Sequence, residues 1–148
     1  YGLHIMIRTD LEIDLLERGL PVEDLPNEWN KRYLNLLGVS PKNDTEGCLQ
    51  DVHWSEGMFG YFPSYLLGHL ISAQLTNTLE NDLGKIENMI EAQKISTILE
   101  WLRENVHHYG RSLDSEELVK HVSGSKLSPD YFLEYLNNKV EKVSSICN

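Results

Sequence analysis

Hydrophobic residues recur at intervals of three and four positions along nearly the whole chain, which is the spacing of one buried face of an α-helix. The expected buried face of the first helix comprises Leu3, Met6, Ile7, Leu11, Leu15 and Leu16. No segment alternates hydrophobic and polar positions over enough residues to indicate a strand. The pattern therefore predicts an all-α fold.

Glycines and prolines divide the first part of this pattern into two helices. Gly19 and Pro21 are expected to end the first helix, because glycine favours a helix stop and proline cannot continue a helix. Pro26 suits the first turn of the second helix, where its missing N–H costs nothing. The expected buried face of this helix comprises Trp29, Tyr33, Leu34 and Leu37, with Gly38 at its end.

The second half of the chain carries further boundary signals. Pro63 suits the first turn of a long helix, and Ser96 is expected to cap a later one. Asp114 followed by Glu117 has the spacing of a capping box. Ser128 is expected to cap the last helix. The expected inward face of that helix comprises Phe132, Tyr135, Leu136, Val140 and Val143.

The stretch from about residue 39 to residue 60 departs from the helical pattern. It has no sustained period and contains Pro41, Asn43, Asp44, Gly47, Gly57 and Gly60. We interpret it as one long ordered loop with at most a short turn of helix. A loop of this length without secondary structure of its own is usually functional.

Length and charge limit the classes to which the protein can belong. A chain of 148 residues and 17.0 kDa predicts one region with a sizeable core, so residues 1–148 are expected to form a single helical region. The net charge of −10 repels phosphate backbones and anionic lipid, so we expect no nucleic-acid or membrane partner. No apolar run is long enough to span a bilayer.

The two cysteines, Cys48 and Cys147, are too few for a disulfide scaffold or a structural zinc site. They are typical of reduced thiols in a cytoplasmic protein, and Cys48 is expected to be a small buried hydrophobe. The sequence has no secretory signal segment and begins at Tyr1 without an initiator Met. We therefore expect the chain to be a piece of a longer protein.

Residues 47–65 hold most of the side chains that are suited to catalysis. Elsewhere the chain has no His-Glu-x-x-His pair, no glycine-rich phosphate loop and no Gly-x-Ser-x-Gly elbow. A histidine beside carboxylates, here His53, can be tuned near neutral pH. Tyrosines at a rigid helix start, here Tyr61 and Tyr65, are good donors to a developing oxyanion.

Each of these residues also has an ordinary structural interpretation. His53 and Glu56 are either two metal ligands or, more commonly, a surface contact, because a third ligand at suitable spacing is missing. Asp51 is either an acid or base or, more commonly, a capping or salt-bridge carboxylate. Tyr61 and Tyr65 share a helix face, so they form either a core stripe or a pair of donors.

Two further groups of residues are expected to be structural. His4, Arg8 and Glu12 are spaced four apart, which predicts a polar helix face. Trp54 and Phe59 are most simply explained as anchors in the hydrophobic core.

Residues 47–54, Gly-Cys-Leu-Gln-Asp-Val-His-Trp, fit the pattern Gly-x-x-Gln-Asp-x-His-Trp. This resembles a signature of the carboxypeptidase Taq family of zinc metallocarboxypeptidases, the thermostable carboxypeptidase 1-like enzymes. The resemblance covers the whole chain, with counterparts in the same order for residues 1–5, 26–30, 59–65, 100–103 and 127–132.

The resemblance implies that the chain is the helical C-terminal part of a larger zincin-type metallopeptidase. The family's His-Glu-x-x-His helix and its downstream Glu ligand would lie N-terminal to Tyr1, so zinc, or cobalt, would have no ligand in this chain. It also implies a peptide substrate with a free C-terminus, association with the remaining N-terminal part of the enzyme, and a homodimer.

Analogy with related helical zinc peptidases implies roles for five residues. His53 would hydrogen-bond the substrate backbone and Tyr61 would donate to the oxyanion, which makes these two the expected catalytic residues. The expected substrate-binding residues are Tyr65, the second choice of donor, and Gln50 and Asp51, which would fix the loop and orient His53.

The missing zinc motif leaves an alternative from another class of protein. The chain would then be a non-catalytic helical fragment or paralogue that acts as a binding or dimerisation module. A His-Glu-x-x-His motif upstream of Tyr1 would decide for the enzyme.

Overall fold

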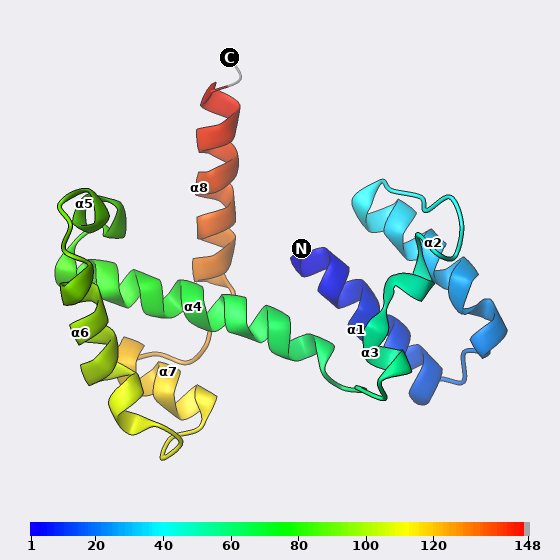
Figure 1. The fold of residues 1–148 in the computed structure, drawn as a ribbon, viewed down its shortest axis with the longest axis horizontal. Helices are drawn as coiled ribbons and strands as arrows, with labels where there is room; N and C mark the ends of the chain where they lie inside the picture. Colours follow the sequence, from blue (N-terminus) through cyan, green and yellow to red (C-terminus); the bar gives the residue numbers. More distant parts are fainter. Residues whose placement is uncertain (147–148) are drawn as a thin grey trace. The chain divides into compact units, whose positions relative to one another are not determined.

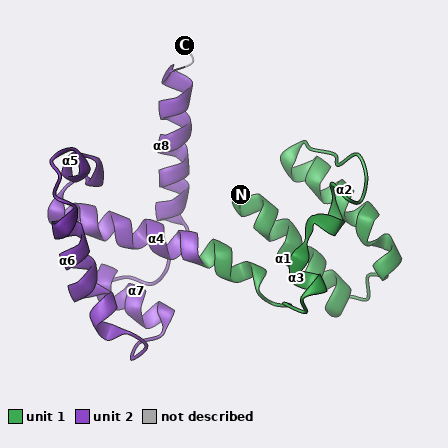
Figure 2. Ribbon diagram, viewed as in Figure 1, with its two compact units in different colours: residues 1–67 green, residues 68–148 purple. Residues whose placement is uncertain are grey.

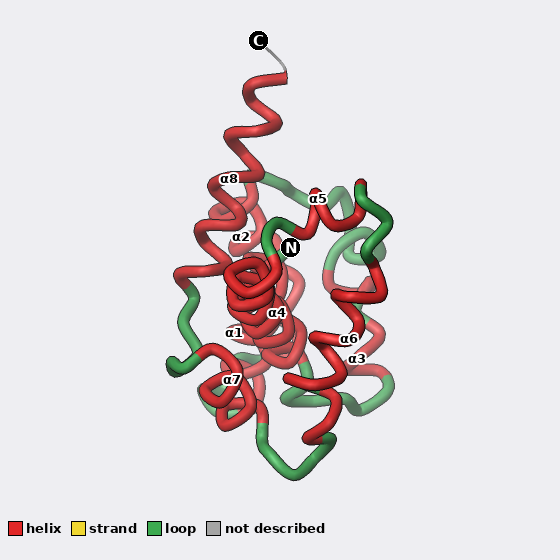
Figure 3. Tube along the Cα trace, turned by 90° about the vertical axis from the view of Figure 1, so that its left-hand side faces the viewer, coloured by secondary structure: helices red, strands yellow, loops and turns green. Residues whose placement is uncertain are grey.

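The computed structural model describes residues 1–146, and these residues form only helices and loops (Figure 1). The helices are α1 (Gly2–Leu16), α2 (Leu25–Leu37), α3 (Val52–Ser55), α4 (Phe62–Leu83), α5 (Ile86–Glu91), α6 (Ile95–Asn105), α7 (Ser115–Ser123) and α8 (Asp130–Ile146). Short 3₁₀ turns are η1 (Val22–Asp24), η2 (Cys48–Gln50) and η3 (His107–Tyr109). The predicted all-α fold is confirmed, and Figure 3 shows the described chain as helix and loop alone.

The chain divides into two compact units, and the boundary between them lies within α4 (Figure 2). Unit 1 comprises residues 1–67 and unit 2 comprises residues 68–148. Unit 1 contains α1, α2, α3 and the first turns of α4, and unit 2 contains the rest of α4 with α5 to α8. The chain length predicted a single helical region for residues 1–148. Within these residues the chain forms two compact units that share α4.

The core of unit 1 forms where α1 packs against α2. Its buried residues are Ile7, Leu11, Trp29, Tyr33 and Cys48, with Leu20, Leu25 and Trp54 packed around them. The rings of Trp29 and Tyr33 stack with their centroids 4.7 Å apart. The expectation that Cys48 is a buried hydrophobe is confirmed, and burial raises the pKa of its thiol.

The buried face of α1 agrees with the prediction at Ile7 and Leu11 and differs from it elsewhere. Its buried residues are Ile5, Ile7, Leu11 and Glu12. Leu3, Met6 and Leu16, which were expected inside, are 43%, 48% and 60% exposed. The helix turns this face inward because its polar side chains have partners there, which the hydrophobic pattern alone does not take into account.

The long segment after α2 is compact and holds two short turns, η2 and α3, where at most one was expected. Gly38 ends α2 in the left-handed conformation with φ of 68°, as predicted. Gly47 allows a close approach of the chain, because a Cβ at this position would lie 3.3 Å from the Asn43 carbonyl oxygen. Close packing therefore explains why the first position of the signature is a glycine.

Unit 2 is held together by polar anchors as well as by apolar burial. Gln74 of α4 is fully buried, and its amide donates to the Ser123 hydroxyl at 2.9 Å and accepts from the Ser128 backbone N–H at 2.9 Å. The predicted capping box is confirmed, since Asp114 and Glu117 bond each other's backbone N–H at 2.9 and 3.0 Å.

Two predictions about unit 2 are wrong. Ser96 does not cap α6, because the helix already begins at Ile95, after Lys94. The face of α8 that was expected to be buried is largely exposed: Tyr135, Leu136, Val140 and Val143 are 51%, 39%, 65% and 55% exposed. The described residues of unit 2 do not cover this face, so the apolar spacing of α8 is not matched by burial within the chain.

Candidate functional site

Three of the predicted site residues lie together in unit 1, and we call His53, Tyr61 and Tyr65 the His53 cluster. The ring centroid of His53 lies 6.0 Å from that of Tyr61 and 5.7 Å from that of Tyr65, and the two tyrosines are 5.3 Å apart. Tyr61 is 46% and Tyr65 36% exposed, so the pair does not form the alternative core stripe. The two tyrosines are therefore exposed at the edge of the cluster, whereas the His53 side chain is only 14% exposed.

Local sequence explains why these side chains converge. The Asp51 carboxylate caps α3 by accepting the His53 backbone N–H at 2.8 Å, which places His53 in the first turn. Tyr61 directly precedes α4, and Tyr65 follows one turn later on the same side. Phe62 lies between the two tyrosines in the sequence and is fully buried. Its ring packs on His53 with centroids 4.9 Å apart and anchors the start of α4.

The imidazole of His53 has a partner at each ring nitrogen. Its Nδ1 lies 3.1 Å from Asp51 Oδ1, and its Nε2 lies 3.0 Å from the Tyr65 hydroxyl. A carboxylate only accepts, so we assign the proton to Nδ1, and Tyr65 then donates its O–H to Nε2. The side chain of His53 is therefore oriented from both sides.

Asp51 connects this cluster to the interior of unit 1. Its side chain has no exposed surface, and its Oδ2 forms an ion pair with Nε of Arg8 at 3.2 Å. The Arg8 guanidinium also lies 5.5 Å from the ring centres of Trp29 and Phe62. Of the interpretations left open for Asp51, its contacts show a cap and a salt-bridge carboxylate.

Residues 4, 8 and 12 of α1 make contacts with other segments that the sequence did not predict. The expected polar face is correct in composition, but it faces the interior: His4 Nδ1 contacts the Tyr33 hydroxyl, and the Glu12 carboxylate accepts the Trp54 indole N–H at 2.9 Å. The signal in the sequence was the four-residue spacing itself, which equally fits a row of buried polar partners.

Four other predicted residues lie apart from the cluster or contact other groups. The Gln50 amide donates to the backbone carbonyl of Thr45, so its contact is within the loop and does not involve His53. Phe59 is 50% exposed, so its prediction as a core anchor is wrong, while Trp54 packs against the core as expected. Glu56 is exposed on the surface.

Comparison with known proteins identifies the family. The model of the carboxypeptidase Taq (M32) metallopeptidase family matches residues 1–140. The chain belongs to the carboxypeptidase Taq (M32) family. The expected resemblance is thereby confirmed, and it extends over both units.

Three members of the family illustrate the likeness. Carboxypeptidase 1 of Bacillus subtilis is 42% identical over 94% of this chain and 28% of its own length. The solved structure of Trypanosoma cruzi metallocarboxypeptidase 1 is 38% identical with a TM-score of 0.88, over 93% of this chain and 29% of that one. The Pyrococcus furiosus carboxypeptidase structure is 36% identical with a TM-score of 0.90, over 94% and 28%.

The chain therefore spans less than a third of the length of these M32 relatives. The family's description as metallopeptidases implies a metal cofactor. Residues 1–146 contain no group of three or more His, Cys, Asp or Glu side chains arranged to hold a metal ion. His53 already has a partner at both nitrogens, so the pairing of His53 with Glu56 does not fit a metal site, and we route no step of a reaction through one.

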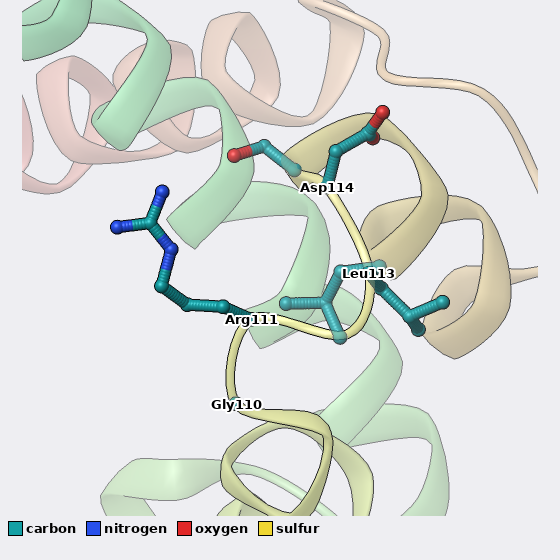
Figure 4. Close-up of a pocket in the computed structure, with 6 residues that line it drawn as sticks. Gly110, Arg111, Leu113 and Asp114 are labelled. Carbon is teal, nitrogen blue, oxygen red and sulfur yellow. The ribbon is translucent and has the colours of Figure 1, made fainter.

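Two cavities of this M32 chain lie in unit 2, away in sequence from the His53 cluster. One of about 430 Å³ is lined by Gly110, Arg111, Leu113, Asp114, Ser115 and Leu118 at the start of α7 (Figure 4). A wider groove of about 920 Å³ runs between α4, α5 and α8. Neither is lined by a predicted site residue.

Among the described residues, no helix is long and apolar enough to cross a membrane.

His4 is expected to make the stability of the folded chain depend on pH. Burial, followed by the neighbouring Arg8 guanidinium, holds the pKa of His4 below its ordinary value of 6.5. Below that value the unfolded chain takes up a proton that the folded chain does not, so stability falls as the pH decreases. We expect the loss in melting temperature between about pH 7.5 and about pH 5 to be smaller in His4→Asn, which keeps an acceptor near Tyr33 but does not titrate.

Proposed function

We propose that this chain is the C-terminal part of a zinc-dependent metallocarboxypeptidase that releases single amino acids from peptide C-termini. The observation that carries the proposal is the His53 cluster, in which His53 of the signature meets two exposed tyrosines, in a chain that matches the M32 family over residues 1–140. The remaining N-terminal part of the enzyme would supply the zinc ligands. A cytoplasmic location agrees with the buried free thiol of Cys48.

Tyr61 is the better candidate for the donor to the oxyanion. Among residues 1–146 its hydroxyl has no hydrogen-bond partner, whereas the Tyr65 hydroxyl is already paired with His53. A preorganised donor with a free O–H stabilises negative charge that develops on the substrate carbonyl. Tyr65 then serves to hold His53 and to line the substrate path.

His53 is proposed to bind the substrate backbone. Its imidazole orientation is fixed by Asp51 and Tyr65, so little conformational entropy is lost when a substrate group replaces or joins the Tyr65 contact. Gln50 would act indirectly, because its bond to Thr45 holds the loop that precedes Asp51.

The 148-residue chain alone is expected to bind no stoichiometric zinc and to show no peptidase activity, since the described residues lack a metal-ligand group. Elemental analysis of the purified chain and release of amino acids from a blocked dipeptide check this. The control is the complete gene product, which should carry His-Glu-x-x-His upstream of Tyr1 and hydrolyse the same peptide. Tight zinc binding by the short chain would contradict the proposed location of the ligands.

A second candidate function is a non-catalytic binding or dimerisation module. The exposed apolar residues of α8, such as Val140 at 65% and Ile146 at 82%, favour it, because exposed apolar stripes mark contact surfaces. A homodimer, as the family resemblance suggests, would also use such a surface. A complete gene product without any zinc motif, and without peptidase activity, would favour this module over the enzyme.

A further inference from the structure

The carboxylate of Glu12 holds two points of the segment that carries the His53 cluster. Its Oε2 accepts the indole N–H of Trp54 at 2.9 Å, and its Oε1 accepts the backbone N–H of Gly60. Trp54 directly follows His53 in sequence, and Gly60 directly precedes Tyr61. A single side chain of α1 thus fixes both ends of the stretch that separates the two proposed catalytic residues.

Burial of the Glu12 carboxylate costs free energy, which its two hydrogen bonds offset in part. The residue is only 6% exposed, and within residues 1–146 it forms no ion pair with a lysine, arginine or histidine. A buried carboxylate without a cationic partner is unfavourable relative to an apolar side chain of similar size. Its two charge-assisted bonds, which are stronger than neutral ones, offset part of this cost and fix the geometry.

The stretch between these two points needs an external restraint. It contains Gly57 and Gly60 in the left-handed conformation, with φ of 70° and 72°, and no regular structure after α3. Glycine allows many backbone conformations, so the position of Tyr61 is not determined by the local chain alone. The packing of Trp54 on Trp29 and Phe62, at 6.2 and 5.9 Å between centroids, gives the clamp a rigid base.

We infer that Glu12 is a positioning residue, which sets the placement of Tyr61 relative to His53 by clamping Trp54 and Gly60. Glu12 does not touch the substrate; it acts through Tyr61. This inference rests on the proposed function for its effect on catalysis, while the clamp itself is independent of that function.

The first test is Glu12→Gln in the complete gene product. Glutamine has one acceptor oxygen and places an NH₂ group against the second N–H donor, so one end of the clamp is released. We expect kcat to fall about ten- to a hundredfold, because small misplacements of catalytic groups carry losses of this size, and KM to change much less. The matched control is Asp10→Asn, which removes the same charge from the exposed side of α1 and should leave kcat unchanged.

A double-mutant cycle separates positioning from general damage. If Glu12 acts through the Tyr61 hydroxyl, Glu12→Gln should cost less than about twofold in kcat when Tyr61→Phe is already present. The same loss in both backgrounds would overturn the inference. If Glu12→Gln does not fold, Trp54→Phe releases the other bond and should give the same non-additive pattern.

A spectroscopic measurement tests the clamp without activity. In ¹H–¹⁵N spectra of the complete gene product, Glu12→Gln should shift the Trp54 indole or Gly60 amide resonance upfield and speed its hydrogen exchange. Unchanged signals would refute the clamp even if Tyr61→Phe abolishes activity. Shifted signals together with full activity of Tyr61→Phe would instead refute the role proposed for Tyr61 and leave the clamp as a purely structural feature. A complete gene product without peptidase activity would refute the proposed function and leave the spectroscopic test of the clamp unaffected, so the failures are distinguishable.

Discussion

Tyr61→Phe in the complete enzyme is expected to lower kcat by about a hundred- to a thousandfold, because one donor to the developing oxyanion is lost. The substitution removes only the hydroxyl, which has no hydrogen-bond partner among residues 1–146, so stability should change little. KM should also change little if the bond forms mainly in the transition state. Steady-state kinetics on a blocked dipeptide, together with the melting temperature, measure both effects.

Tyr135→Phe is the matched control for this experiment, since it removes the same group from an exposed tyrosine of α8 in unit 2. It should retain normal kinetics. His53→Ala should also lower kcat/KM, since it removes the proposed contact to the substrate backbone. Normal kcat/KM in both Tyr61→Phe and His53→Ala would show that the roles assigned to the His53 cluster are wrong.

Asp51→Ala is expected to have the largest effect on stability, lowering the free energy of unfolding by about 3–5 kcal/mol, because it leaves a buried charge without its partner. The side chains of Asp51 and Arg8 are 0% and 12% exposed. The substitution also removes the cap of α3 and the acceptor for Nδ1 of His53. Urea unfolding of the 148-residue chain, followed by tryptophan fluorescence, measures the loss.

A surface ion pair provides the comparison for Asp51. Lys31 lies 2.8 Å from Glu28, and its side chain is 64% exposed. Lys31→Ala should cost much less stability than Asp51→Ala, because exposed pairs are screened by water and salt. Equal losses for Asp51→Ala and Lys31→Ala would contradict the view that burial makes the Arg8–Asp51 pair structurally important.

Much of the local structure was predictable from short-range signals. The helix end at Gly38, Pro26 in the first turn of α2, and the capping box of Asp114 with Glu117 each depend on backbone geometry within a few residues. The prediction for Ser96 failed because capping is a preference, and α6 begins two residues earlier than this signal indicates.

The buried faces were less predictable than the helices. Hydrophobic spacing correctly placed Ile7 and Leu11 of α1 inside. It also placed Leu3 and Met6 there, yet Ile5 and Glu12 are buried instead. The reason is that polar partners on other segments, such as Trp54, make the burial of Glu12 acceptable. A pattern within one helix does not contain that information.

The sequence by itself determined that the protein is all-α, where its principal helices lie, and that residues 47–54 carry a carboxypeptidase Taq signature, because these depend on local spacing and residue type. Only the tertiary structure decided that Arg8 and Glu12 support the signature segment from α1, and that Tyr61 and Tyr65 are exposed and differ in their hydroxyl partners. These contacts join residues far apart in the chain, and they are selected by the total free energy of packing, charge pairing and hydrogen bonding in the folded unit.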